Sequence, residues 1–300
     1  EGAAPSSRQG QAQVEQPIAE RIIEPPRRVS RDLLAVLLFA GLWQNGPLIW
    51  TLTLREVTSR YRGSFLGLLW PFLQPLLLLA VYTFVFSFVF GARWPGVFES
   101  DLVGYAVVVF CGLVTFNIFA ESVRTCPQVI LAHRTFVQRV VFPLEVLPVA
   151  QVGAALVHAT AGLAIVFVFL LLSDAKLHAA ALWLPVVWLC FALFSLGICY
   201  LVASISVYVR DFEPLVAIGI TGLFFGSGIF YPLERLPDVI EPWVRMLPPA
   251  GAVDWSRRLL LLGEAPGAID LLSLAGVSFL VFAVGYAWFM MSKGGFADAL

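Results

Sequence analysis

The side chains best suited to catalysis or metal binding are few in this chain and lie far apart. No cysteine belongs to a CxxC pair, no histidine to an HExxH motif and no serine to a GxSxG motif, and a Walker A sequence is also absent. The cysteines fall in or beside apolar runs, which predicts small buried side chains. These residues are Cys111, Cys126, Cys190 and Cys199, and the histidines are His133, His158 and His178. The sequence therefore indicates no site for a metal, a nucleotide or a covalent intermediate.

Acidic side chains are absent from the middle of every long apolar run. Proton- and sodium-coupled carriers place such a group there, so energy for transport must come from another molecule, most simply a soluble ATPase. His158 does lie inside an apolar run, where it is either a proton relay or a hydrogen-bonded interior residue. Asp211, Glu213 and His133 are the cluster that a membrane-embedded transferase would use, but their spacing matches no catalytic motif.

The composition is that of an integral membrane protein. Mean hydropathy is +0.86 and charged residues make up 13% of the chain, against about 25% in soluble domains. A charge at the bilayer centre costs about 2.5–3.5 kcal/mol, so charge-free runs of about 20 residues or more mark membrane spans. We expect an all-α fold with six transmembrane helices within about 63–292. Their ranges are about 65–91, 102–123, 144–172, 182–207, 213–231 and 269–291.

The N-terminal part divides into a polar tail and an interfacial segment. Residues 1–32 are polar and proline-rich, which predicts a disordered tail without the apolar core of a signal peptide. Residues 33–62 are interrupted at Asn45-Gly46-Pro47, where a new helix should begin. Trp50, Leu54, Val57 and Tyr61 share one face of that helix, as in an amphipathic helix on a membrane surface. Most of the 19 basic residues fall on this side, which predicts that both termini, including 293–300, are cytoplasmic.

Two further features lie at the ends of the expected spans. Asn117 and Glu121 lie near the cytoplasmic end of the second span, where they could cap it or pair with Arg124. The segment of about 231–268 is amphipathic in two pieces that are separated at Pro248-Pro249 and are too short to span. We expect two half-inserted outer helices here. Irregular backbone at membrane depth is tolerated only against protein or a water-filled cavity, so this segment implies a cavity or gate.

Four short motifs occur in the order found in one transporter family. They are RYRGSFLGLLWP at 60–71, FPLEVLP at 142–148, Arg210-Asp211, and GIFYP at 228–232. Together they resemble the signatures of type-2 ABC exporter permeases, the membrane subunits that export O-antigen, capsule or teichoic acid chains. The resemblance covers about 45–292.

The resemblance implies a homodimer that works with two copies of an ABC nucleotide-binding subunit. ATP and Mg would be bound by that partner subunit, and this chain would need no cofactor. The helices at about 47–61 and 126–138 would contact the ATPase. The residues concerned are Arg55, Glu56, Gln128, His133, Arg134 and Arg139. The location would be the bacterial inner membrane, with lipids as further partners, and the net charge of −1 gives no indication of nucleic acid.

The resemblance also implies a continuous channel for an undecaprenyl-linked polysaccharide. Aromatic rings suit sugars because pyranose C–H faces stack on them, and weak contacts at many places let a long chain slide. The candidate channel residues are Phe86, Phe90, Phe110, Phe116, Phe224, Phe225 and Tyr231. Arg60 and Arg62 would either meet the pyrophosphate of the substrate or anchor to anionic headgroups. Export of a small lipid or drug, and a membrane-embedded transferase, are the alternative functions.

Overall fold

The computed structural model describes residues 44–60, 65, 67–89, 91, 94, 102–133, 142–172, 178–209 and 211–299. Every regular element within these ranges is a helix, which agrees with the all-α expectation. The candidate residues Arg62, Phe90, Arg134 and Arg139, and the predicted tail, lie outside the described residues. Residues Asn45–Leu300 form one unit by their contacts.

Five helical segments in the described part of the chain are long and apolar enough to cross a membrane. They are Phe72–Val89, Gly104–Val129, Val146–Leu171, Ala179–Tyr208 and Ala268–Gly295. The helices concerned are α3 (Trp70–Tyr82) with the π-helical segment η3 (Thr83–Val89), α4 (Leu102–Val129), α6 (Val146–Leu172), η5 (Ala179–Trp183) with α7 (Leu184–Tyr208), and α11 (Ala268–Ser292) followed by η8 (Lys293–Gly295). All five correspond to spans expected from the charge-free runs.

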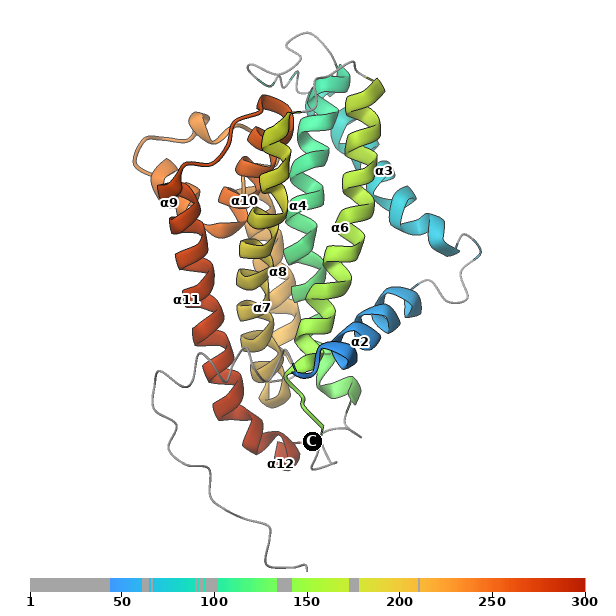
Figure 1. Cartoon of the computed structure of the whole chain (residues 1–300), viewed down its shortest axis with the longest axis vertical. Helices are drawn as coiled ribbons and strands as arrows, with labels where there is room; N and C mark the ends of the chain where they lie inside the picture. Colours follow the sequence, from blue (N-terminus) through green and yellow to red (C-terminus); the bar gives the residue numbers. More distant parts are fainter. Residues whose placement is uncertain are drawn as a thin grey trace, which may run out of the picture. The chain divides into compact units, whose positions relative to one another are not determined.

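The remaining expected span, 213–231, is shorter than predicted. Its helix, α8, covers Phe212–Gly226, only 15 residues, and a turn follows it. The helix ends because Gly228 adopts a positive φ of 66°, which a residue with a side chain rarely takes. Figure 1 shows α8 running beside α7 in the opposite direction. The absence of charge from 214 to 233 marked the apolar run correctly but could not reveal this early end.

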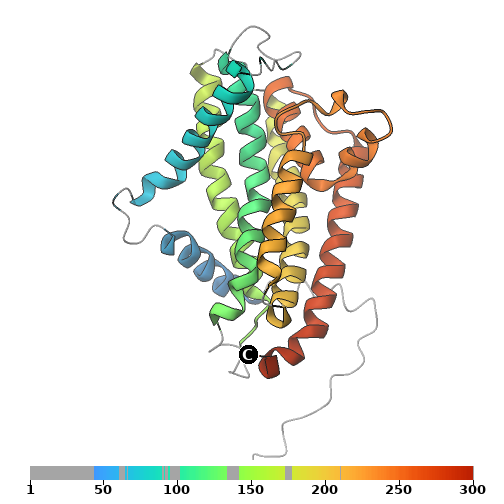
Figure 2. The same ribbon diagram turned by 180° about the vertical axis from the view of Figure 1, so that it is seen from behind.

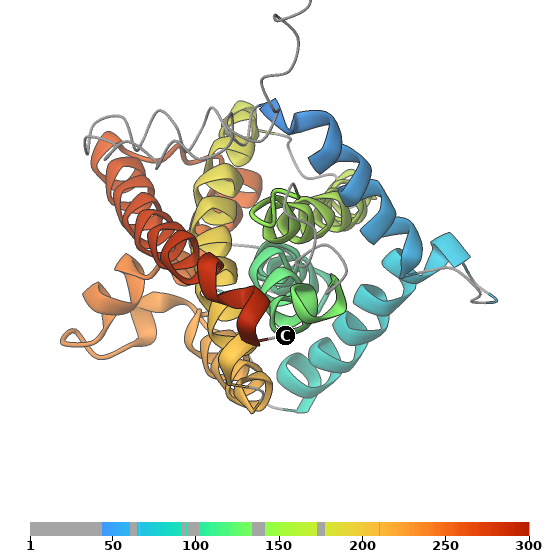
Figure 3. The same ribbon diagram turned by 90° about the horizontal axis from the view of Figure 1, so that it is seen from below.

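Helix α4 forms the centre of the bundle. It packs against α6, α7, α8 and α10, and Figure 3 shows it surrounded by the other long helices. Its apolar residues are almost all buried, as expected for a helix that contacts protein on every side. Figures 1 and 2 show α3 inclined away from α4 and α6 toward one end. Residues of α3, α4 and α6 line the cavity described below.

The expected interfacial helix corresponds to α2 (Gly46–Ser59), which begins at the predicted position with Pro47 in its first turn. It runs obliquely to the long helices and packs on α6. Leu52 and Thr53 are buried in that contact, whereas Trp50 is 59% exposed and Leu54 is also exposed. Two of the four residues of the predicted apolar face thus point away from the protein, as lipid contact would require, while Val57 is half-buried and Tyr61 lies outside the described residues.

The outer segment contains η6 (Leu233–Arg235), α9 (Glu241–Met246), α10 (Pro248–Arg257) and the π-helical segment η7 (Arg258–Leu262). The break at Pro248-Pro249 marks the start of α10, because a proline fits the first turn of a helix. We expected two half-inserted amphipathic helices here, and the two short helices differ from each other in burial. Helix α9 is exposed, with Trp243 on its surface, whereas most of α10 is buried against α4 and α7.

The small helix α12 (Phe296–Ala299) follows η8 at the end of α11. Lys293 pairs with Glu145 across 2.6 Å, which fixes this end of α11 near the start of α6. The chain that connects α10 to α11 lies at the end of α11 that is far from α12 (Figure 1).

Candidate functional site

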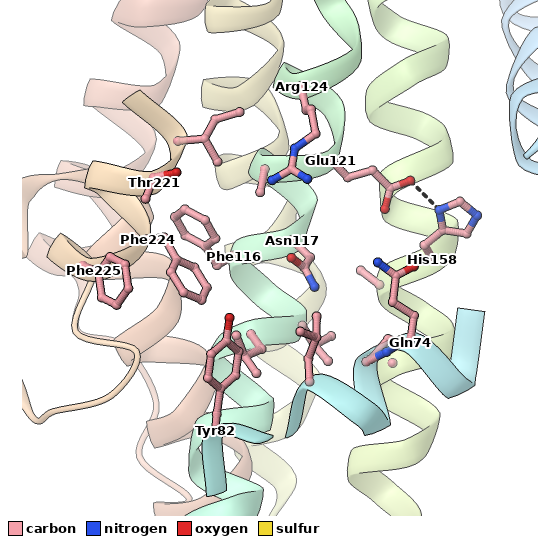
Figure 4. Close-up of a pocket in the computed structure, with 18 of the residues that line it drawn as sticks. Gln74, Tyr82, Phe116, Asn117, Glu121, Arg124, His158, Thr221, Phe224 and Phe225 are labelled. Atoms are coloured by element: carbon pink, nitrogen blue, oxygen red, sulfur yellow. Dashed lines mark hydrogen bonds and ion pairs between the residues drawn. The ribbon is translucent and has the colours of Figure 1, made fainter. Parts of the chain in front are cut away.

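A cavity of about 670 Å³ lies between α3, α4, α6 and α8, with Arg60 at the end of α2 as a further wall residue. Figure 4 shows that its walls are of two kinds. Tyr82, Phe116, Phe224 and Phe225 gather on one side. The other side carries polar or charged groups, namely Gln74, Asn117, Glu121, Arg124 and His158. A ligand that fits this cavity would therefore combine a charged or polar group with a surface that stacks on rings.

The aromatic wall is a connected cluster of rings. Phe224 lies at its centre, with ring centroids 5.5 Å from Phe116, 6.0 Å from Tyr82 and 5.3 Å from Phe225. Phe230 lies 5.3 Å from Phe224 and continues the cluster beyond the cavity. Most of these pairs are edge-to-face or tilted, the arrangements that aromatic quadrupoles favour. The rings come from three helices and from the turn after α8, so the cluster depends on their packing.

The charged wall contains a small hydrogen-bonded network. Arg60 Nη1 donates to Glu121 Oε1 at 2.5 Å, and His158 Nδ1 lies 2.5 Å from the same oxygen. Within the described part of the chain, Arg124 makes no ion pair or side-chain hydrogen bond. Two guanidinium groups thus face a single carboxylate, which leaves this wall with excess positive charge. Such a wall attracts anions.

The predicted channel residues divide into three groups. Phe116, Phe224 and Phe225 line the cavity, and Phe86 joins their cluster by stacking on Phe230 at 4.4 Å. Phe110 is fully buried in α4 and does not line the cavity. Tyr231 also lies outside the lining, and its hydroxyl donates to the carbonyl of Phe225 at 3.0 Å. Neither of these last two residues lines this cavity, and their assignment to a substrate channel stays a prediction.

Two aromatic residues of this cluster were missed by the sequence analysis. Tyr82 lies four residues before Phe86, so helical spacing places both on one side of the first span. Phe230 belongs to the GIFYP motif, from which only Tyr231 was selected. A helical-face analysis of the aromatic run at 82–90 would have found Tyr82, whereas Phe230 lies in a turn and has no such signal.

The polar residues of the cavity make contacts that their spacing along the chain did not indicate. Arg60 lines the cavity, as expected of a residue that could meet a phosphate. Glu121 pairs with Arg60 and His158 and not with Arg124, its neighbour along the same helix. His158 is hydrogen-bonded to Glu121, an arrangement that both of its interpretations allow.

The residues expected to contact an ATPase lie on two elements. Arg55 is exposed and Glu56 is half-buried on α2. Gln128 is on the last turn of α4, and its side-chain amide donates to Glu213 Oε2 at 2.6 Å. His133 is in η4 (Leu131–His133), with Nδ1 2.8 Å from the carbonyl of Val129. The expected surface helix at 126–138 needs correction, since residues 126–129 form the end of α4 and a 3₁₀ turn follows.

The end of the bundle that carries α9 and α10 contains a buried cation that the sequence analysis did not single out. Arg257 is 5% exposed. Its Nη1 donates to the carbonyl of Gly228 at 2.7 Å, Nη2 to that of Ile229 at 2.5 Å, and Nε to that of Val108 at 3.0 Å. Burial lowers the pKa of Arg257 to about 10, so the guanidinium remains cationic at neutral pH. Arg257 therefore joins α10 to α4 and to the turn after α8.

Close packing around Arg257 requires a glycine on α4. A Cβ atom at Gly112 would lie 2.5 Å from Arg257 Nη2, too close for any side chain at that position. The ring of Trp94 lies on the guanidinium, 4.5 Å from Cζ. Such a stacked cation contributes attraction in addition to its hydrogen bonds.

Within the described residues, no group of three or more His, Cys, Asp or Glu side chains could hold a metal ion. Cys111, Cys126 and Cys199 are buried and Cys190 is half-buried, as their apolar surroundings predicted.

Comparison with known proteins places the chain in a family. The model of ABC-2 type transporters matches residues 47–261. The chain belongs to this family. The resemblance to type-2 ABC exporter permeases that the short motifs indicated is thereby confirmed. The match includes α2, the cavity helices and the outer helices through Arg257 and Arg258.

Similar members of the ABC-2 family are export permeases. An O-antigen export system permease protein RfbA from Myxococcus xanthus is 29% identical over 273 residues, 88% of this chain and 100% of the relative. The protein of the same description from Klebsiella pneumoniae is 25% identical over 256 residues, 84% of this chain and 95% of the relative. The capsule polysaccharide export inner-membrane protein CtrC of Neisseria meningitidis serogroup A is 24% identical over 205 residues, 67% of this chain and 74% of the relative. The family and the apolar helices together identify a multi-pass membrane protein.

Proposed function

We propose that this chain is the transmembrane subunit of an ATP-driven exporter that moves a lipid-linked polysaccharide across the inner membrane. The single observation that carries the proposal is the cavity, whose wall of rings faces a wall with two arginines. Rings suit the C–H faces of sugars, and guanidinium groups suit the phosphates that join such sugars to a lipid. The O-antigen and capsule permeases among its relatives support this substrate class.

The proposed topology has six crossings, with α8 as the fifth. Its 15 residues rise about 22 Å, less than the hydrocarbon thickness of about 30 Å. The turn at 227–231 would complete the crossing, because Arg257 and the surrounding helices satisfy its carbonyls at membrane depth. An even number of crossings puts both termini on the same side of the membrane, and the distribution of basic residues predicts that this side is the cytoplasm. Single-cysteine variants at Glu213 and Glu264 should then react with impermeant reagents from opposite sides, and labelling of both from one side would contradict this topology.

The proposed assembly is a homodimer in which α8 meets the second copy. Gly219, Gly222 and Gly226 lie on α8, and added Cβ atoms there would meet no atom of this chain. Small residues allow close approach of helices within a bilayer. Since Phe224 and Phe225 belong to the same helix, a dimer formed there would place the two aromatic clusters on either side of a shared channel.

Energy would come from two copies of a separate nucleotide-binding subunit, which would bind ATP and Mg. Arg55, Glu56, Gln128 and His133 would contact it, together with Arg134 and Arg139. Replacing His133 with Glu should weaken copurification with the ATPase while membrane insertion is retained. Copurification equal to that of the wild type would count against this contact.

Deletion of the gene that encodes this chain, in the bacterium from which the chain comes, tests the proposed function. Loss of surface polysaccharide, with lipid-linked polysaccharide retained at the cytoplasmic face, is the expected result. Expression of the wild-type chain should restore export. Normal surface polysaccharide in the deletion strain would overturn the proposal and favour export of a small lipid or drug.

A further inference from the structure

The charged wall of the cavity contains an acidic residue, Glu121. A carboxylate at this place would repel an anionic substrate, so its presence needs an explanation. Glu121 Oε1 accepts a hydrogen bond from Arg60, the residue expected to meet the substrate phosphate. A carboxylate and a phosphate oxygen are equivalent partners for a guanidinium, because both offer anionic oxygens to the same N–H groups. The position that a phosphate would take on Arg60 is therefore already occupied by a side chain of the protein.

The geometry of the pair allows this occupation to be temporary. The side chain of Arg60 is 44% exposed, and an ion pair with so exposed a partner is weak because water competes for its guanidinium. Arg60 is the C-cap residue that follows α2, so it reaches α4 from a separate element. A guanidinium in this situation can exchange one anion for another without disrupting packed structure.

His158 removes the main objection to such an exchange. A carboxylate left without a partner in a largely buried place would be strongly destabilised. Glu121 is 19% exposed, but its Oε1 also lies 2.5 Å from Nδ1 of His158 on α6. If Arg60 turned to another anion, Glu121 would retain this second hydrogen bond. Arg124, whose guanidinium lines the same cavity, provides a nearby positive charge for either anion.

We propose that Glu121 is a resident competitor for the diphosphate headgroup of the substrate. It holds Arg60 while the cavity is empty and yields it when the headgroup arrives. This inference rests on the proposed function, because it assumes that a lipid-linked diphosphate enters the cavity. Its consequence is a specificity filter, since a ligand must carry enough negative charge to displace a carboxylate. Neutral lipids cannot do so.

Binding to the full-length chain in phosphatidylcholine nanodiscs tests the proposal. The probe is farnesyl diphosphate, with inorganic pyrophosphate as a second arm to separate a lipid-borne headgroup from a free anion. Glu121→Gln removes the competing charge and should lower the Kd of farnesyl diphosphate about threefold to fivefold, the range set by a weak exposed pair. Arg60→Gln should raise that Kd about tenfold. The double variant should behave like Arg60→Gln, because the competitor matters only while its target is present.

Glu145→Gln is the matched control. Glu145 also accepts from one cation, Lys293 at 2.6 Å, and its side chain is 17% exposed, but it lies outside the cavity lining. This variant should leave the Kd of farnesyl diphosphate unchanged. The result for pyrophosphate shows whether the lipid chain is needed, and tighter binding of either probe in Glu121→Gln supports the competitor role.

Failure of this inference differs from failure of the proposed function. If the wild type binds farnesyl diphosphate and Arg60→Gln weakens binding, but Glu121→Gln leaves it unchanged or weaker, Glu121 is a structural partner of Arg60 and the competitor role is overturned. If neither probe binds to any variant, the diphosphate site itself is overturned. The thermal stability of each variant, measured in the same nanodiscs, establishes that an absence of binding is not an absence of folded protein.

Discussion

Two arginines connect helices at different ends of this bundle, and they are held in opposite ways. Arg257 is 5% exposed and donates to three backbone carbonyls, from α4 and from the turn after α8. Arg60 is 44% exposed and has one carboxylate partner in the structure. The difference shows which end of the bundle can change its contacts. An arginine fixed to carbonyls has no alternative partner, whereas one that faces a cavity can accept another anion.

The largest effect expected from this comparison is that of Arg257→Ala. It would leave carbonyls unpaired inside the outer end of the bundle, and such losses cost on the order of 3–5 kcal/mol. We expect a markedly lower unfolding temperature and a lower yield of folded protein by size-exclusion chromatography. Arg257→Lys keeps the charge, but a lysine lacks the planar fork that reaches three carbonyls. Its unfolding temperature should therefore lie between those of the wild type and Arg257→Ala. Wild-type stability in Arg257→Ala would show that Arg257 is not a fixed structural connection and does not differ from Arg60 in this way.

A smaller effect on the same contact is expected from Gly112→Ala. The added Cβ would lie 2.5 Å from Arg257 Nη2 and would displace the guanidinium. Overpacking of this kind destabilises by about 1–3 kcal/mol. Gly276→Ala on α11 is the control, since no atom lies within 4 Å of the added Cβ. Equal unfolding temperatures for Gly112→Ala and Gly276→Ala would show that the surroundings of Arg257 are not tightly packed.

At the cavity, the aromatic wall should matter for export more than for folding. Phe224→Ala removes the ring that contacts Phe116, Tyr82 and Phe225. If the contact of this ring with a sugar is worth as much as a contact between two rings, about 0.5–1.5 kcal/mol, export should fall about threefold to tenfold. Phe279→Ala, which removes an exposed ring on α11, is the comparison. Surface polysaccharide per cell, normalised to the amount of protein in the membrane, is the measurement.

The smallest effect on stability should come from the pair at the cavity. Arg60→Gln removes an exposed ion pair, and the expected change in unfolding free energy is about 0.2–1 kcal/mol. Lys293→Gln, which breaks the pair with Glu145, should have a change of similar size. A loss in Arg60→Gln as large as that in Arg257→Ala would mean that Arg60 is a fixed structural connection.

The charge-free runs predicted most of the fold because a charge in hydrocarbon is costly wherever it lies along the chain. Proline positions added the starts of α2 and α10, since Pro47 and Pro248 fit a first helical turn. The end of α8 could not be obtained in this way. It depends on the backbone of Gly228 and on carbonyls that a distant arginine satisfies.

The cavity residues could be selected from the sequence where they are rings on apolar spans, and could not where they depend on packing. Phe116, Phe224 and Phe225 were identified because rings on apolar spans were the natural channel candidates. The contacts of Glu121 with Arg60 and His158 join residues 61 and 37 positions apart, and no local pattern encodes them. Arg257 was missed for the same reason, because a basic residue outside an apolar span is normally solvated.

The length of α4 has a mechanical consequence. This single helix of 28 residues, about 42 Å long, carries Gln128 at one end, the cavity residues Phe116 and Glu121 along its middle, and Val108 and Gly112 against Arg257 near the other end. A push applied at Gln128 would therefore travel along one stiff rod to the far side of the bilayer. The cavity wall and the contacts of α4 with Arg257 would tilt together, as parts of one lever.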